Sequence, residues 1–159
     1  VLMSATRKAK RKAKAKRIGT AKPSLAKLKA KLWGLLAPAV KAAYPPRCYT
    51  CGRAPLTGTN HHAGHMFAKG RSHALSAFDP RNLRPQDWYC NINLGGNGAE
   101  FARRYIAMHG QAEFDEVARM SEIHHKWTAP EVQELIDRIK VGLETYQSYY
   151  IETYGQETR

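Results

Sequence analysis

Acidic residues are absent from the first half of this chain. Residues 1–78 contain 17 lysines and arginines but no aspartate or glutamate, and Asp79 is the first acidic residue. The second half carries nine basic and 13 acidic residues, so the formal net charge of +13 originates in the first half. This asymmetry favours a polyanionic partner, of which nucleic acid is the simplest.

Long apolar segments are absent as well. No run of about 18 apolar residues occurs, which argues against a transmembrane helix, and no apolar stretch follows the basic N-terminus as in a signal peptide. The chain has three cysteines, and because a disulfide framework would leave one of them over, metal binding fits them better. We therefore expect a cytoplasmic protein that has no membrane partner.

Residues 1–22 are predicted to form a basic arm. Lysine and arginine alternate there mostly with alanine, and such dense positive charge favours disorder in the free protein. On DNA the arm can become helical and contact phosphates. A solubilising tail without a partner is the alternative interpretation. The arm residues expected to contact DNA are Arg7, Lys8, Lys10, Arg11, Lys12, Lys14, Lys16 and Arg17.

The sequence predicts an amphipathic lead-in helix over residues 23–44. Pro23 and Ser24 are typical of a helix start, and leucines recur after them at helical spacing. Two shorter helices are predicted at residues 99–108 and 113–122. These segments frame a glycine-, proline- and histidine-rich region that contains all three cysteines.

A long C-terminal helix is predicted over residues 128–159. Thr128 suits the cap position, Pro130 suits the first turn, and Glu131 completes a capping box. Three tyrosines near the end of this helix extend its apolar face as packing residues or, alternatively, offer a base-stacking surface or a dimer interface. They are Tyr149, Tyr150 and Tyr154.

Two short motifs predict a structural zinc site. Each has a gap of two residues between potential ligands, and two such half-sites commonly assemble one tetrahedral zinc site. Asp87 is the less common ligand type, and His61 or His73 are alternatives to it. A redox pair is a weaker interpretation of the first motif, since no βαβ pattern surrounds it. The expected ligands are Cys48, Cys51, Asp87 and Cys90.

Histidines and asparagines lie between and beside these half-sites in an informative order. Along the chain the order is half-site, histidine, asparagine, half-site and asparagine, which is typical of HNH nucleases in their His-Asn-Asn form. These nucleases hold one divalent metal in a ββα unit. Taken singly, each residue could be a packed histidine or a turn-forming asparagine. The three residues that fit the pattern are His65, Asn82 and Asn91.

From Cys48 to Tyr146 the chain resembles the NinG/Rap recombination nucleases of lambda-type phages, which are themselves HNH-like. The resemblance implies a DNA endonuclease of phage recombination that cuts branched DNA, such as Holliday junctions or D-loops, in the cytoplasm of a bacterial host. The shared motifs are Cys48-x-x-Cys51-Gly52, Ala63-Gly64-His65, Arg81-Asn82, Gln86, Cys90-Asn91, Gly96-Asn97, His109-Gly110 and His125-Lys126-Trp127-Thr128.

Two positions depart from the family pattern. Asp87 stands where the family has a cysteine, and His62 stands where it typically has an aspartate. Imidazole binds Mn²⁺ or Zn²⁺ well but suits Mg²⁺ poorly. The substitution at His62 therefore implies either a changed metal preference or an impaired activity.

Each residue of the pattern has an expected role in phosphodiester hydrolysis. His65 is the candidate general base, because imidazole titrates near neutral pH. Asn91 and His62 would hold the catalytic Mg²⁺ or Mn²⁺. Asn82 would hold the loop and orient the base. The neighbouring Arg81 and Arg84 are expected to contact phosphates.

These observations together predict an α+β protein. A small ββα-metal core of the HNH (His-Me finger) type, at residues 45–127, would be stapled by a structural zinc and surrounded by helices. The expected function is metal-dependent cleavage of branched DNA, and a homodimer is expected because junction resolution requires two cuts. The alternative is a non-catalytic zinc-knuckle protein that binds nucleic acid, such as a decayed nuclease. A basic protein associated with RNA or the ribosome explains the arm but not His65, Asn82 and Asn91.

Overall fold

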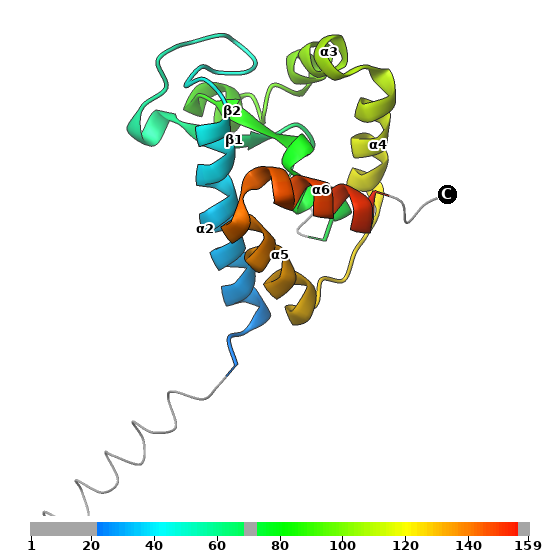
Figure 1. The fold of residues 1–159 in the computed structure, drawn as a ribbon. Coiled ribbons are helices and arrows are strands. Elements are labelled where there is room, and N and C mark those ends of the chain that lie inside the picture. The colour runs from blue at the N-terminus through cyan, green and yellow to red at the C-terminus, as the bar shows by residue number, and fades with distance from the viewer. Residues whose placement is uncertain (1–21, 69–72, 156–159) are drawn as a thin grey trace, which may run out of the picture.

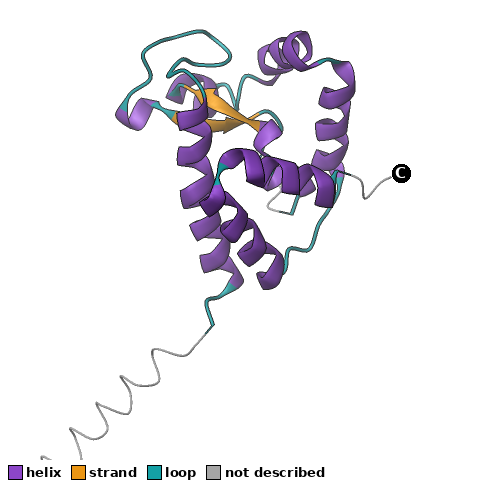
Figure 2. Ribbon diagram, in the orientation of Figure 1, coloured by secondary structure: helices purple, strands orange, loops and turns teal. Residues whose placement is uncertain are grey.

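The computed structural model describes residues 22–68 and 73–155 of the 159 residues. The predicted basic arm lies outside these residues apart from Lys22. The described residues form a helix-rich α+β fold with one two-stranded sheet (Figure 1, Figure 2). Its elements in chain order are α2 (Leu25–Ala43), η1 (Gly58–Asn60), β1 (His62–His65), η2 (Leu75–Phe78), η3 (Pro80–Asn82), β2 (Leu83–Gln86), η4 (Tyr89–Asn93), α3 (Gly98–His109), α4 (Gln111–Glu122), α5 (Ala129–Val141) and α6 (Leu143–Tyr154).

Helix α2 confirms the predicted lead-in helix. The hydroxyl of Ser24 caps it by accepting a hydrogen bond from the backbone N–H of Lys27, at 3.4 Å. One stripe of this helix is buried against α5 and both strands. Burying each leucine of the stripe contributes about 2 kcal/mol to stability. The stripe consists of Leu28, Leu32, Leu36 and Val40.

The prediction of a single C-terminal helix is wrong, because the helix breaks at Gly142. That residue has φ 155° and ψ 160°, which ends the helical hydrogen-bond pattern between α5 and α6. The predicted start of α5 is confirmed, since Thr128 and Glu131 form a capping box. The break turns α6 back across the fold, where it packs on both α2 and α5 (Figure 1).

Tyrosines of α6 lie in the main core. The hydroxyl of Tyr146 donates to the carbonyl oxygen of Phe78 at 2.8 Å, and the hydroxyl of Tyr150 donates to that of Leu75. Tyr154 is also buried. Packing is thus the role of Tyr150 and Tyr154, and neither offers a base-stacking surface or a dimer interface. These contacts anchor η2, the start of a segment at 74–87 in which every residue is buried.

The two strands of the sheet run antiparallel. β1 pairs with β2 so that His62 faces Gln86 and His65 faces Leu83. Alternation along β1 places His62 and His65 on opposite sides of the strand, as predicted. β1 contains the candidate residues His62 and His65, and β2 is followed directly by the second cysteine motif.

Helices α3 and α4 confirm the two predicted short helices to within two residues at each end. Gly110, with φ 86°, lies between them. Their inner faces form a second, smaller core with Met66, the residue after β1; its other buried members are Phe101, Tyr105 and Val117. Across the described part of the chain, no helix combines the length and the apolar character needed to cross a membrane.

Candidate functional site

The two predicted half-sites come together in one cluster. The sulfur or carboxylate atoms of Cys48, Cys51, Asp87 and Cys90 all lie within 4.8 Å of one another. Cys48 and Cys51 follow α2, Asp87 follows β2 directly, and Cys90 lies in η4. This cluster could hold a structural metal ion, and its three thiols and one carboxylate suit tetrahedral zinc. The alternative ligands His61 and His73 are not part of it.

Hydrogen bonds favour the anionic form of two of the four cluster residues, Asp87 and Cys48. By contrast, burial raises the pKa of Cys51 to about 12 and also raises that of Cys90. Oδ1 of Asp87 accepts a hydrogen bond from the backbone N–H of Cys90 at 2.7 Å, and Oδ2 accepts one from the Cys51 thiol at 3.2 Å. Burial opposes ionisation of Asp87, but these bonds lower its pKa. Burial likewise opposes ionisation of Cys48, yet hydrogen bonds from the backbone of Cys51 and from Thr50 lower the pKa of Cys48 to about 7. Anionic ligands are the form that binds zinc.

His62 and Asn91 also meet. Asn91 lies in η4 directly after Cys90, and its Nδ2 is 3.0 Å from Nδ1 of His62. Nε2 of His62 is 2.8 Å from the carbonyl oxygen of Thr59, which can only accept, so Nε2 carries the proton. Nδ1 of His62 therefore accepts from the Asn91 amide, and this contact sets the direction of the amide oxygen.

The backbone of Gly64 makes room for that oxygen. A Cβ at this position would lie 3.0 Å from Oδ1 of Asn91 and would overlap Oε1 of Gln86. Only glycine therefore allows the two amide oxygens to approach β1. Because Gly64 precedes His65, the amide oxygen of Asn91 lies beside the strand that presents the candidate base.

Gln86 is a site residue that sequence reasoning did not assign. Its Nε2 donates to Oγ1 of Thr50 at 3.2 Å and to the carbonyl oxygen of Gly96 at 2.7 Å. The side chain thus ties the first cysteine motif to the loop after η4. Its Oε1 is buried and finds no hydrogen-bond partner among the described residues. The only sequence signal was its presence among the shared family motifs.

The ring of His65 is held from two directions. Its Nε2 is 3.2 Å from the carbonyl oxygen of Ala77, so Nε2 donates and the neutral ring has its lone pair on Nδ1. The ring also stacks on the indole of Trp33 in α2, with centroids 5.2 Å apart. Trp33 was not among the residues assigned from the sequence, since the helical pattern marked only the leucine face of α2.

Asn82 makes the loop contacts expected of it. Its Nδ2 donates to the carbonyl oxygens of Phe67 and Ser76, both at 3.1 Å, and its Oδ1 accepts from the N–H of Phe67 at 2.8 Å. The side chain is completely buried. It connects the residues after β1 to η2, and the next residue of η2, Ala77, holds His65.

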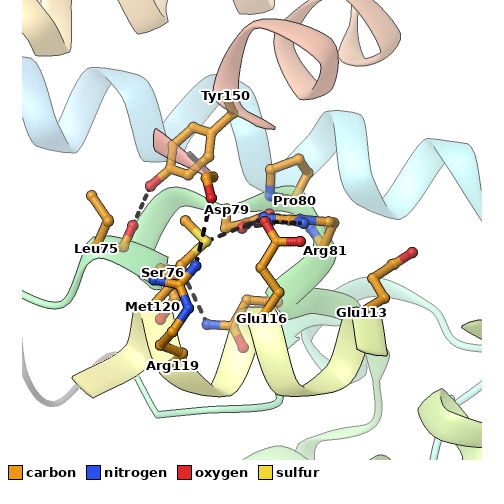
Figure 3. Close-up of polar contacts among 12 residues, drawn as sticks. Leu75, Ser76, Asp79, Pro80, Arg81, Glu113, Glu116, Arg119, Met120 and Tyr150 are labelled. Atoms are coloured by element: carbon orange, nitrogen blue, oxygen red, sulfur yellow. Dashed lines mark hydrogen bonds and ion pairs between the residues drawn. The ribbon is translucent and has the colours of Figure 1, made fainter. Parts of the chain in front are cut away.

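Arg81 does not lie on the surface. Its guanidinium is 4% exposed and pairs with Asp79 at 2.8 Å and with Glu116 at 3.0 Å (Figure 3). Burial disfavours the charge, but the hydrogen bonds and charge of Asp79 raise the pKa of Arg81. The expectation that Arg81 contacts phosphates is therefore corrected, because its donors are used to tie η3 to α4.

Arg84 is also internal. It is 2% exposed, and its guanidinium lies 4.9 Å from the ring centroid of Tyr44 and 5.1 Å from that of Tyr105. It also donates to Nε2 of His109 at 3.0 Å. Burial and the charge of Arg84 lower the pKa of His109. Arg84 thus joins β2 to α3 and, contrary to expectation, has its guanidinium inside the fold.

Comparison with known proteins agrees with the motif analysis. A family model described as Bacteriophage Lambda NinG protein matches residues 3–148, which is most of the chain. The match includes the whole cysteine and aspartate cluster together with His62, His65, Asn82 and Asn91. No curated protein and no solved structure gives a match.

Proposed function

Because the chain belongs to the family of the bacteriophage lambda NinG protein, we propose that it is a metal-dependent endonuclease that cleaves branched DNA during phage recombination. The observation that carries the proposal is that β1 brings His62 into contact with Asn91 and that η2 holds both His65 and Asn82, beside a cluster that suits zinc. The order β1, β2, η4 supports an HNH-like ββα unit, since η4 supplies Asn91 directly after the sheet.

In this function His65 is the general base. Nδ1 takes a proton from water while the water oxygen forms a bond to phosphorus and the bond from phosphorus to the leaving 3′ oxygen breaks. The leaving oxygen then takes a proton from solvent. The carbonyl oxygen of Ala77 keeps the proton on Nε2, and Trp33 fixes the plane of the ring.

Asn91 and His62 are the residues that would hold the catalytic metal. A divalent cation there, Mg²⁺ or Mn²⁺, supplies stabilisation of negative charge on the phosphate and on the leaving oxygen. The amide oxygen of Asn91 is its natural ligand, and His62 directs that oxygen through the 3.0 Å contact with Nδ2. His62 itself would bind the ion through Nδ1 only by exchanging this contact for the metal, because its Nε2 is hydrogen-bonded to Thr59. An imidazole in this place favours Mn²⁺ over Mg²⁺.

The zinc cluster has a supporting role. It ties the loop after α2 to the segment that runs from β2 into η4, and Asn91 follows the last ligand of the cluster directly. A metal ion held by these four residues would fix the backbone that presents Asn91. The basic arm at residues 1–22 contributes contacts to phosphates that do not depend on sequence.

Cleavage of a four-way junction beside a linear duplex of the same sequence tests the proposal. The zinc-loaded full chain is expected to cut the junction in Mn²⁺, and His65→Ala is expected to lower the rate by about 10²–10⁴ while DNA affinity stays the same. A zinc-loaded chain that binds DNA but cuts neither substrate in Mg²⁺ or Mn²⁺ would support the alternative, a non-catalytic zinc-knuckle protein.

A further inference from the structure

Large apolar side chains are exposed on the second cysteine motif. Six large hydrophobic residues are exposed in the described part of the chain, and four of them lie within the seven residues from 88 to 94. Their exposed fractions lie between 46% and 54%. Clustered exposure of this kind marks an interaction surface, whereas single exposed residues need no explanation. We call this surface the knuckle patch; it consists of Trp88, Tyr89, Ile92 and Leu94.

The backbone under the knuckle patch is held in place. Trp88 and Tyr89 lie between the ligands Asp87 and Cys90, and the N–H of Trp88 donates to Oδ1 of Asn60 at 2.8 Å. The N–H of Leu94 donates to the carbonyl oxygen of Tyr89 at 3.0 Å. The patch is therefore an ordered surface that the fold exposes without covering it.

The charge around the patch identifies its partner class. Among the described residues before Glu100, the acidic ones are Asp79 and Asp87, and these are 0% and 1% exposed. Exposed carboxylates are therefore absent from the described residues before Glu100, whereas exposed cations are present. One of these cations, Arg53, is 61% exposed and pairs with the buried carboxylate of Asp87 at 3.6 Å. An apolar patch on a basic surface matches a partner that has both apolar faces and negative charge. Nucleic acid has this chemistry, because its bases are flat and its backbone phosphates are anionic.

We propose that the knuckle patch stacks against unpaired or unstacked bases at a DNA branch point and thereby places the cut beside the branch. The inference rests on the proposed function and adds how the substrate is selected. Bases inside a linear duplex stack on each other, whereas a branch exposes base faces that aromatic and aliphatic side chains can cover. Asn91 lies between Tyr89 and Ile92 in the chain, so the patch and the candidate catalytic metal act on the same stretch of DNA.

Binding measurements with two DNA forms test this inference. The zinc-loaded full chain and its variants are titrated, at one salt concentration, with a four-way junction and with a linear duplex of the same sequence. Trp88→Ala and, separately, Ile92→Ala are expected to weaken junction binding about tenfold and duplex binding less than about twofold. Trp88→Phe keeps a ring and should retain most of the affinity. Val141→Ala, at a residue of α5 that is 73% exposed, should change neither.

The outcomes separate the inference from the proposed function. Equal weakening on both DNA forms would make the patch a general DNA contact and overturn its branch selectivity. A change from dimer to monomer in Trp88→Ala would make it a contact between two copies of the chain, which also overturns it. Normal junction binding and cleavage by Trp88→Ala would contradict the proposed role of the knuckle patch and would leave the proposed nuclease function standing. If Trp88→Ala selectively loses junction binding but the original chain cuts no DNA, the role of the patch is supported and the proposed nuclease function is contradicted.

Discussion

The imidazole of His65 and the indole of Trp33 lie face to face, with their planes 14° apart. Trp33 belongs to α2 and lies beside its buried stripe, where it also packs against the main core. The lead-in helix is therefore part of the candidate site, because it orients the proposed base. This contact gives the helix a function besides packing.

Replacing Trp33 should impair catalysis more than binding. In Trp33→Ala the ring of His65 keeps its hydrogen bond to Ala77 but loses the surface that fixes its plane, so we expect kcat to fall about tenfold. Trp33→Phe retains a stacking ring and should recover most of the rate. Single-turnover cleavage of a junction, with DNA affinity measured separately, distinguishes the two effects. An equal loss in both variants would argue against a positioning role.

Zinc should be a component of the folded protein. We expect about one tightly bound zinc per chain, and Cys48→Ser or Cys90→Ser should lose it together with stability, since binding to such a site contributes folding free energy. Asp87→Cys completes the family pattern and should retain zinc against stronger chelators. Metal analysis and thermal unfolding of each purified variant provide the measurement. Full zinc content in Asp87→Ala would show that Asp87 is not a ligand.

Local patterns explain which features the sequence predicted. The cysteines and the aspartate of the candidate metal cluster occur in two short motifs, and the helix starts at Ser24 and Thr128 depend on side chains within three residues of the cap. Such features need no knowledge of the tertiary fold. The broken helix was missed because Gly142 lies inside an apolar pattern that continues with helical spacing on both sides.

Features that depend on distant residues were missed. Arg81 pairs with its neighbour Asp79 and with Glu116, which lies 35 positions further along the chain. The contact with α4 and the burial of the pair depend on the tertiary fold and were not visible in the local sequence. Trp33 and His65 meet only because α2 packs on β1. Arg81 was therefore predicted to contact DNA, although it forms ion pairs inside the fold.

Arg81 should matter for stability and not for DNA contact. Arg81→Ala leaves Asp79 buried without its main partner, and we expect it to lower the free energy of unfolding by about 3–5 kcal/mol. Glu116→Gln keeps the contact between Asp79 and Arg81 and alters a side chain that is 32% exposed, so its cost should be much smaller. Urea unfolding measures both. An unchanged unfolding midpoint in Arg81→Ala, combined with weaker DNA binding, would restore the phosphate-contact interpretation.

Two glycines provide a matched pair of alanine substitutions. A Cβ at Gly64 would overlap Oε1 of Gln86 and crowd Oδ1 of Asn91, so Gly64→Ala should displace these two side chains, destabilise the fold and abolish cleavage. A Cβ at Gly34 in α2 meets nothing within 4 Å, and Gly34→Ala should stabilise the helix by about 0.5–1 kcal/mol. Thermal unfolding and junction cleavage of the two variants check this contrast. Wild-type cleavage by Gly64→Ala would mean that the approach of the amide oxygens to β1 is not required.

The metal preference should depend on His62. This residue directs the amide of Asn91 and stands where the family typically has an aspartate, so His62→Asp replaces an imidazole nitrogen with a carboxylate oxygen at the proposed metal. Carboxylate oxygen suits Mg²⁺, whereas imidazole suits Mn²⁺ and other transition metals. We therefore expect the variant to have a higher ratio of cleavage rate in Mg²⁺ to that in Mn²⁺ than the original chain. His62→Gln, which can still accept from the Asn91 amide but carries no charge, is the control and should not gain activity in Mg²⁺. If His62→Asp and the original chain have the same ratio, His62 acts only by orienting Asn91 and does not contact the metal.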